Sequence, residues 1–314
     1  MIVGILILLF VLVLVVLYGI AFYSPYPNQN QDFHLPSGEA YDEQQEKSNE
    51  MIARIKEVPF EPVTTRSTDG LLLSGRLYDA PSDAPIAICF HGYRGTAYRD
   101  YCGGGWMLIQ MGYRVLLIDE RAHGSSEGHT ITFGVRERAD VLCWIKEMTK
   151  RFGEKTPIVL FGISMGGASV LMSTALSLPD NVKGIVADCP YNSPEEILRK
   201  TIREDAKLPD SIFYPLLKLS AKWFGHFDLN VPSAAQSVKS FGRPILILHG
   251  EADTLVPPYM SATVAEEQES IQRETFPGAE HGLSFMVDEE RYETLTRDFL
   301  SRCLNRKGET THDA

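Results

Sequence analysis

Residues 158–168 read Ile-Val-Leu-Phe-Gly-Ile-Ser-Met-Gly-Gly-Ala, and this stretch decides the fold. An apolar, strand-like run breaks into a Gly-x-Ser-x-Gly pattern at Gly162, Ser164 and Gly166, and residues that favour a helix follow. The serine of such a pattern sits on a turn so sharp that its neighbours two positions away need almost no side chain. A glycine-rich strand-to-helix turn in any α/β protein also fits these residues, so the rest of the chain has to distinguish the two interpretations.

Predicted strands and helices alternate on both sides of this turn. Strands are expected at 60–65, 71–77, 86–90, 113–119, 158–162, 182–187, 244–249 and 273–276, and helices at 106–111, 135–152, 164–177, 259–269 and 287–304. Such alternation forms βαβ units and predicts a mostly parallel sheet that is covered by helices on both faces. In open α/β sheets the reactive groups gather just beyond the carboxyl ends of the strands.

Two later strands are followed by residues that can serve the serine. The loop after one strand carries Asp253, and the last strand is followed by His281. With Ser164 they occur along the chain in the order nucleophile, acid, base. Glu251 and Asp188 are alternatives for the acid, and His281 could be an ordinary loop histidine. The Asp-x-x-Val-Pro sequence favours Asp253, because it sets this residue just before a turn that can aim its carboxylate at the histidine.

The composition is that of one large globular domain with an appendage. The 314 residues carry a net charge of −11 without a cluster of Lys and Arg, which argues against nucleic-acid binding. The five cysteines are odd in number and lack framework spacing, and Cys89 and Cys189 lie in apolar runs where they are expected to be buried. No His-x-x-x-His or Cys-x-x-Cys pair occurs, so we expect neither a metal nor a cofactor.

Residues 2–22 form an uninterrupted apolar stretch of about the length that crosses a bilayer as a helix. We predict a retained single-pass membrane anchor at 1–25, with a cleaved signal peptide and a buried core helix as alternatives. The first Lys or Arg is Lys47, so only the amino terminus is positive near the membrane. This charge weakly favours an extracytoplasmic domain, although the cysteine pattern favours the opposite side.

The polar segment 26–55 is predicted to be a tether, because it cannot bury enough apolar surface to fold alone. The globular domain is expected at 56–305 and a polar tail at 306–314. About fifty residues, roughly 191–240, do not belong to the sheet and carry apolar residues at helical spacing. They predict a small helical lid, whose apolar residues either pack it onto the domain or line a site for an acyl chain.

The chain from 62 to 303 resembles the α/β-hydrolase superfamily, and it most resembles the serine hydrolases that include esterases and serine aminopeptidases. The resemblance rests on the terminal histidine and four blocks in the expected order: His91-Gly92-Tyr93-Arg94-Gly95, Asp119-Glu120-Arg121-Ala122-His123-Gly124-Ser125-Ser126, Gly162 to Gly167, and His249-Gly250-Glu251-Ala252-Asp253. Ala122 stands where this group usually has glycine. These blocks are highly specific for the fold and much less specific for the substrate.

The resemblance implies an oxyanion hole formed by the backbone N–H groups of Tyr93 and Met165. Such donors stabilise the negative charge of a tetrahedral intermediate without having to reorganise. Other polar residues of the blocks are expected to fix loops rather than to take part in the chemistry: His91, Asp119, Arg121 and His123.

The reaction implied is hydrolysis of an acyl ester by a serine hydrolase through an acyl-enzyme on Ser164, typical of a carboxylesterase or lipase-like enzyme. Asp253 and His281 would complete the catalytic triad. The expected partners are a small-molecule or lipid-like acyl substrate and the membrane. A peptidase or amidase with the same triad, and a non-catalytic binding protein on a hydrolase fold, are the alternatives.

Overall fold

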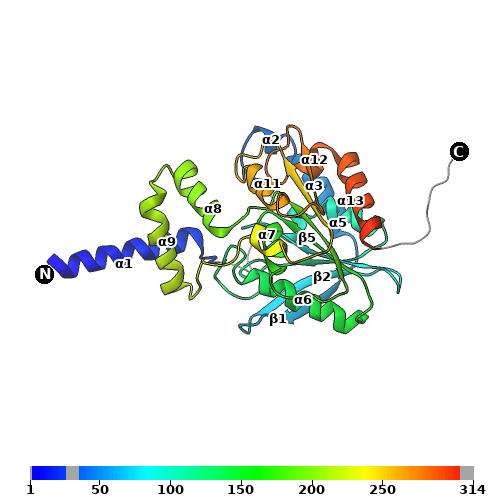
Figure 1. Cartoon of the computed structure of the whole chain (residues 1–314), viewed down its shortest axis with the longest axis horizontal. Coiled ribbons are helices and arrows are strands. Elements are labelled where there is room, and N and C mark those ends of the chain that lie inside the picture. The colour runs from blue at the N-terminus through cyan, green and yellow to red at the C-terminus, as the bar shows by residue number, and fades with distance from the viewer. Residues whose placement is uncertain (1, 26–34, 305–314) are drawn as a thin grey trace.

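A computed structural model describes residues 2–25 and 35–304 (Figure 1). Its centre is an eight-stranded sheet in the order β1-β2-β4-β3-β5-β6-β7-β8. The strands are β1 (Glu61–Arg66), β2 (Leu72–Tyr78), β3 (Ile86–Phe90), β4 (Arg114–Ile118), β5 (Ile158–Ile163), β6 (Val182–Asp188), β7 (Ile245–Gly250) and β8 (Ile271–Phe276). Only β2 runs against the other strands, since it pairs antiparallel with both β1 and β4.

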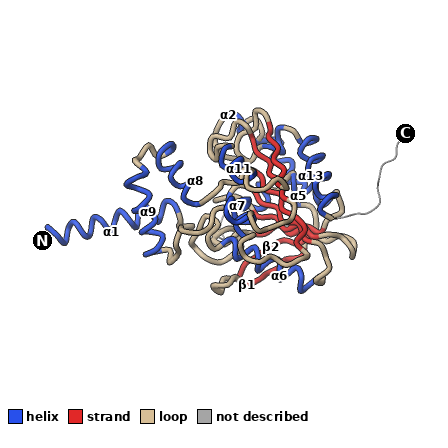
Figure 2. Tube along the Cα trace, in the orientation of Figure 1, coloured by secondary structure: helices blue, strands red, loops and turns tan. Residues whose placement is uncertain are grey.

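The parallel strands are apolar because helices cover both faces of the sheet (Figure 2). Every residue of β3, β4 and β7 is buried. One face carries α3 (Gln45–Lys56), α4 (Ala97–Asp100), α5 (Gly104–Gln110), α12 (Ser284–Val287) and α13 (Glu289–Cys303). The other carries α6 (Glu137–Phe152), α7 (Met165–Ser173), α10 (Ala234–Val238) and α11 (Tyr259–Ala265). The predicted fold class is therefore confirmed, and every expected strand and helix is present with differences only at the ends.

The lid lies between β6 and β7 and consists of α8 (Pro194–Lys200), a π-helical turn (Thr201–Asp205) and α9 (Asp210–Phe224). The predicted lid extends to about residue 240, but α10 belongs to the body of the domain. Its residues Ala234 and Val238 are fully buried in the core beside α7. The helical lid is therefore shorter than predicted.

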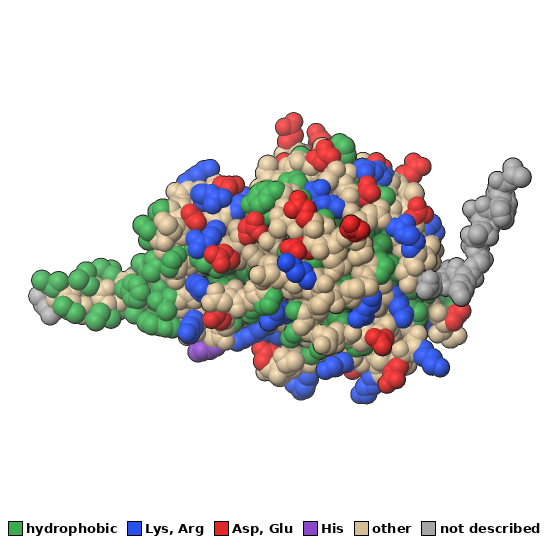
Figure 3. All heavy atoms as spheres, in the orientation of Figure 1, with side chains coloured by type: hydrophobic (Ala, Val, Ile, Leu, Met, Phe, Trp, Pro, Cys, Tyr) green, Lys and Arg blue, Asp and Glu red, His purple; other side chains and the backbone are tan. Residues whose placement is uncertain are grey.

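The apolar N-terminal stretch forms α1 (Ile2–Ala21), which projects from the domain on the side of the lid (Figure 1). Apolar side chains cover its free part (Figure 3). The end near Ala21 does contact the domain, since α1 packs along α9. By length and composition α1 is the one helix of the described residues that could cross a membrane.

The prediction of a tether at 26–55 is wrong for the part that the structure describes. A short helix, α2 (Glu39–Asp42), is followed by α3, which buries Met51, Ile52 and Ile55 against the domain. These three residues share one face of a helix, so a segment with few apolar residues still buries all of them. Residues 26–34 and the predicted tail at 306–314 lie outside the described residues.

Candidate active site

Ser164 lies at the turn between β5 and α7, with φ 55° and ψ −115°. This conformation is strained for a residue with a side chain, and such strain persists only where the surroundings impose it. The glycines on either side impose it here. A methyl group on Gly166 would overlap the carbonyl oxygen of Phe90, and one on Gly162 would overlap the carbonyl of Gly166. The sharp turn predicted from the Gly-x-Ser-x-Gly pattern is therefore present.

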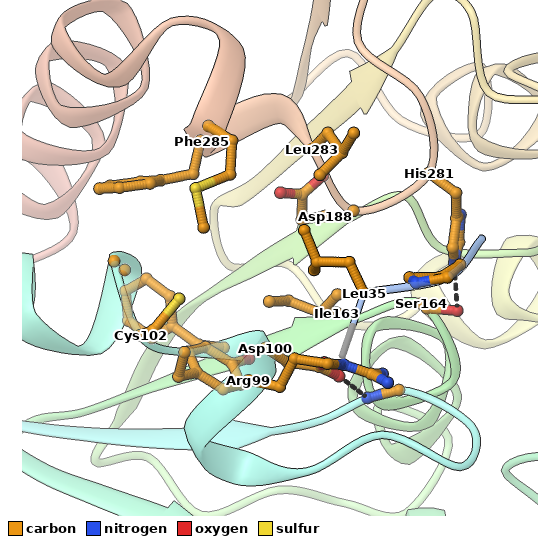
Figure 4. Close-up of a pocket in the computed structure, with 18 of the residues that line it drawn as sticks. Leu35, Arg99, Asp100, Cys102, Ile163, Ser164, Asp188, His281, Leu283 and Phe285 are labelled. Atoms are coloured by element: carbon orange, nitrogen blue, oxygen red, sulfur yellow. Dashed lines mark hydrogen bonds and ion pairs between the residues drawn. The ribbon is translucent and has the colours of Figure 1, made fainter. Parts of the chain in front are cut away.

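Of the three residues predicted as a catalytic triad, His281 lies within hydrogen-bond distance of both Ser164 (Figure 4) and Asp253. His281 Nε2 lies 2.8 Å from Ser164 Oγ, and His281 Nδ1 lies 2.7 Å from Asp253 Oδ2. A carboxylate only accepts, so Nδ1 carries the imidazole proton and Nε2 can accept the proton of the serine hydroxyl. The serine is thus aligned for activation by a general base.

Asp253 is held as a carboxylate. Its Oδ1 accepts hydrogen bonds from the backbone N–H groups of Leu255 (3.0 Å) and Val256 (2.7 Å), which form the predicted turn. Burial acts to raise the pKa of Asp253, but His281 and a hydrogen bond from His249 outweigh it and lower the pKa to about 2.

His249 was not among the residues predicted for the site. Its Nε2 lies 3.2 Å from Asp253 Oδ2 and 2.8 Å from the carbonyl oxygen of Val256. The signal that could have identified it is its position, at the end of β7 and four residues before Asp253, in the same sequence block.

The two alternative acids make other contacts. Asp188 Oδ1 accepts a hydrogen bond from Ser284 Oγ at 3.1 Å, and burial raises the pKa of Asp188 to about 6. Glu251 Oε1 accepts one from Thr275 Oγ1 at 2.6 Å. Among the described residues, Asp253 provides the only carboxylate within hydrogen-bond distance of the His281 ring.

The predicted oxyanion donors lie next to the serine. Met165 begins α7, and Tyr93 lies in the loop after β3. In the described part of the chain neither backbone N–H donates to a protein acceptor, whereas the N–H groups on both sides of Tyr93 do. Gly92 N donates to Asp100 Oδ2 at 2.7 Å, and Arg94 N donates to His123 Nε2 at 3.0 Å. The loop is fixed on both sides of Tyr93, and two donors remain available to a bound oxygen.

The polar residues expected to fix loops do so. His91 donates from Nδ1 to the carbonyl of Gly92 at 2.8 Å and accepts from the N–H of Glu120 at 3.0 Å. Arg121 is buried and forms a two-point ion pair with Asp140, with distances of 2.6 and 2.7 Å. A bidentate ion pair fixes orientation as well as distance.

The remaining predicted loop-fixing residue, Asp119, accepts from Arg76 Nη1 at 2.9 Å and from the backbone N–H of Ser125 at 2.9 Å. These contacts tie the loop after β4 to β2. They leave Asp119 no role in proton transfer at the serine.

One group of three side chains has the proximity of a metal site: Cys189, Asp253 and His281. Each ring nitrogen of His281 already has a hydrogen-bond partner: Nδ1 pairs with Asp253 and Nε2 with Ser164. Burial raises the pKa of the Cys189 thiol well above its usual value, so the sulfur stays protonated, whereas a metal binds the thiolate. The donor chemistry therefore favours a proton-transfer site over a metal site.

Two cavities meet at Ser164. The first, of about 290 Å³, has a mostly apolar lining that also includes Arg99 and Asp100 (Figure 4) as well as Tyr41. Tyr41 belongs to α2 and donates from its hydroxyl to the carbonyl of His281 at 3.1 Å. Nothing in the polar sequence around Tyr41 indicated that it reaches the site. The second cavity, of about 320 Å³, is mostly apolar and lies between α1, the lid and the serine.

Known proteins are similar to this chain in sequence. A family model described as serine aminopeptidase, S33, matches residues 82–227. Lysophosphatidylserine lipase ABHD12 of Danio rerio is 31% identical over 188 residues, which cover 56% of this chain and 45% of the lipase. The uncharacterized membrane protein YNL320W of Saccharomyces cerevisiae is 30% identical over 194 residues, which cover 61% of this chain and 62% of that protein. The chain thus spans between about half and two thirds of the length of these relatives.

The fold also matches solved structures. The Pyrococcus furiosus esterase Pf2001 superposes with a TM-score of 0.66 at 22% sequence identity, covering 88% of this chain and 98% of the esterase. The sheet order, the turn at Ser164 and the structural match lead to one conclusion: the chain has the α/β-hydrolase fold.

Proposed function

We propose that this α/β-hydrolase is a serine esterase that cleaves an acyl ester through an acyl-enzyme on Ser164. The observation that carries the proposal is the unbroken hydrogen-bonded series Ser164, His281 and Asp253, at distances of 2.8 and 2.7 Å. It ends at a serine on a strained turn, beside two free backbone N–H groups and two cavities. The names of the relatives, a lipase and an esterase, support the same reaction class.

The reaction follows from these positions. His281 Nε2 takes the hydroxyl proton of Ser164 as the oxygen attacks the acyl carbonyl, and the new oxyanion accepts hydrogen bonds from Tyr93 N and Met165 N. The C–O bond to the alcohol then breaks, and His281 returns the proton to the leaving oxygen. Water repeats the sequence on the acyl-enzyme and releases the acid. Asp253 keeps the imidazole in the required tautomer and stabilises its cation.

The test is the reaction of the full-length chain in detergent micelles with a fluorophosphonate probe and with esters. We expect the probe to label wild type at Ser164 and not Ser164→Ala, whose kcat on a nitrophenyl ester falls by about 10⁴-fold or more. Ser169→Ala is the matched control, because Ser169 is buried in α7 with its hydroxyl on a backbone carbonyl. Equal rates for Ser164→Ala and wild type would refute the proposal.

A panel of aminoacyl amides tests the second candidate function. The family model named serine aminopeptidase favours peptidase or amidase activity, which uses the same residues. Faster cleavage of the amides than of matched esters would assign the chain to that activity instead.

We also propose that α1 is a single-pass membrane anchor with the domain on the extracytoplasmic side. The 20 residues of α1 contain no charged side chain, and the yeast relative is named a membrane protein. An alkaline carbonate wash should leave the full-length chain in the membrane, and protease added outside intact cells or spheroplasts should digest the domain. Survival of the domain until the membrane is opened would reverse the orientation.

A further inference from the structure

The domain end of α1 is built into the domain rather than attached through a flexible joint. Leu14 and Phe22 are fully buried. The ring of Phe22 makes edge-to-face contacts with Phe227 and Phe133, at centroid distances of 5.2 and 5.9 Å. These contacts fix the last turns of α1 relative to the body of the domain, and the packing of α1 along α9 fixes them relative to the lid.

The same helix end is hydrogen-bonded to the loop after β3. The Tyr93 hydroxyl donates to the carbonyl of Ala21 at 2.9 Å, and the Arg94 guanidinium donates to the carbonyls of Ile20 (3.0 Å) and Tyr23 (3.2 Å). The last carbonyls of a helix lack partners within it, and a cation at this end also interacts favourably with the helix dipole. The loop that carries the predicted oxyanion donor therefore caps α1.

The apolar cavity of about 320 Å³ lies where this helix end, the lid and Ser164 meet. Leu17, Ile20 and Ala21 line it from α1, and Ile202 and Phe213 are among the residues that line it from the lid. Without α1 the cavity would lack one side. Its volume falls at the lower end of the range for small-molecule sites, and its lining contains no charged side chain.

We propose that this cavity binds the acyl chain of the substrate and that the last two turns of α1 form the wall that sets the length of chain accepted. The inference rests on the proposed function, because the chain has to end at a carbonyl beside Ser164. A fatty acyl chain is the occupant, since the cavity is apolar and continues into the exposed apolar surface of α1. The cavity that contains Arg99 and Asp100 also reaches Ser164 and is left for the alcohol portion of the ester, although most of its lining is apolar.

A chain that fills the cavity should bind by transfer of methylene groups out of water. Each methylene gained should raise kcat/KM about fourfold, the factor equivalent to ~0.8 kcal/mol. The increase should stop at the chain length that reaches the far wall.

The first experiment measures kcat/KM of the full-length protein in detergent micelles with nitrophenyl esters from acetate to dodecanoate. Leu17→Trp narrows the cavity from α1, and Leu9→Trp is the matched control because Leu9 is exposed and lies outside the cavity. We expect Leu17→Trp to lower the rate on the longest esters at least tenfold and to keep the rate on acetate, while Leu9→Trp retains the wild-type profile. The same chain-length profile in all three proteins would overturn the proposal, whereas loss of acetate hydrolysis in Ser164→Ala tests the proposed function separately.

A second measurement on wild type avoids any folding defect of the variants. A long-chain fluorophosphonate with a diazirine at the end of its tail phosphonylates Ser164: the oxygen–phosphorus bond forms, fluoride leaves, and His281 takes the serine proton. After irradiation, we expect cross-links on peptides of α1 or the lid. Cross-links confined to α2 or to the loop with Arg99 would place the chain in the other cavity and refute the assignment.

Discussion

Ser164 combines a strained backbone with an aligned side chain. The φ of 55° at Ser164 raises the free energy of the folded state. The conformation persists because Gly162 and Gly166 allow the backbone to approach closely and the surrounding strands hold the turn in place. This conformation places the Ser164 hydroxyl 2.8 Å from His281 Nε2. It also leaves the backbone N–H of Met165 without a protein acceptor among the described residues. One unusual residue conformation therefore positions both the proposed nucleophile and one of the proposed oxyanion donors.

Replacing Asp253 by Asn should lower kcat by about 10³–10⁴-fold with little change in KM, because the amide does not hold the Nδ1–H tautomer of His281 or stabilise its cation. Glu251→Gln is the matched control in the same loop, since Glu251 bonds to Thr275 and not to the histidine. Steady-state ester hydrolysis measures both. Comparable activity of the two variants would show that Asp253 is not the acid.

Replacing Asp188 by Asn should make the protein more stable at neutral and alkaline pH. Burial raises the pKa of Asp188 from 3.8 to about 6, so the folded state binds its proton more tightly than the unfolded state. The carboxylate therefore destabilises the fold above pH 6, and this cost disappears as the pH falls from about 6 to about 4. We expect Asp188→Asn to gain about 3 kcal/mol at about pH 8 and nothing at about pH 4.

Denaturant unfolding of both proteins in micelles across this pH range measures the difference. A gain of the same size at every pH would show that packing, rather than the charge, distinguishes the two side chains.

At this scale the sequence predicted the positions of Ser164, Asp253 and His281, because each follows a strand end that the apolar pattern marks. It did not reveal Tyr41 or the capping of α1 by Arg94. Both contacts join segments far apart in the chain through single polar side chains, and no local periodicity encodes such a pairing.

At the scale of elements, the turn between β5 and α7 depends on the absence of side chains. Gly166→Ala should destabilise the domain by about 3 kcal/mol or more, since its methyl group would overlap the carbonyl of Phe90 in β3. Gly104→Ala in α5 is the control, because the nearest atom to its added methyl lies 4.0 Å away. Alanine in this helix should be neutral or stabilising. Thermal unfolding compares the three proteins, and equal stability of both variants would refute this account of the turn.

The segment 35–56 shows which kind of element cannot be predicted from overall composition. Its overall polarity favoured a tether, yet three apolar residues on one face of α3 suffice to hold the helix against α4 and the hydrophobic core on that face of the sheet. The long strands were predictable because burial on both faces requires apolar residues throughout. A short helix on the edge of the domain needs only a few such residues.

At the scale of the whole molecule, an α1 that spans a bilayer would hold the lid at the membrane, because the two are packed together. The helix is about 30 Å long, the thickness of a hydrocarbon core, but only about its first 18 Å lie before the buried residue Leu14. The remainder packs against α9, whose Ile212 and Trp223 are 59% and 51% exposed. The lid must therefore lie at the level of the lipid headgroups or deeper.

Brominated lipids should accordingly quench the fluorescence of Trp223. The measurement uses the full-length chain in vesicles with Trp106 and Trp144 changed to Phe, which leaves Trp223 as its one tryptophan. A chain that retains only Trp144, which is buried beneath the sheet, is the control and should not be quenched. Absence of quenching for Trp223 would mean that the lid stays above the membrane.

The two cavities that meet at Ser164 have a consequence for the fate of the products. The cavity of about 320 Å³ adjoins α1, whereas the cavity that contains Arg99 and Asp100 has no residue of α1 in its lining. Hydrolysis of an amphiphile held across this junction would separate its halves by solubility. The fatty acid would return along the helix to the bilayer, and the alcohol would depart into water, so that neither product has to cross the path of the other.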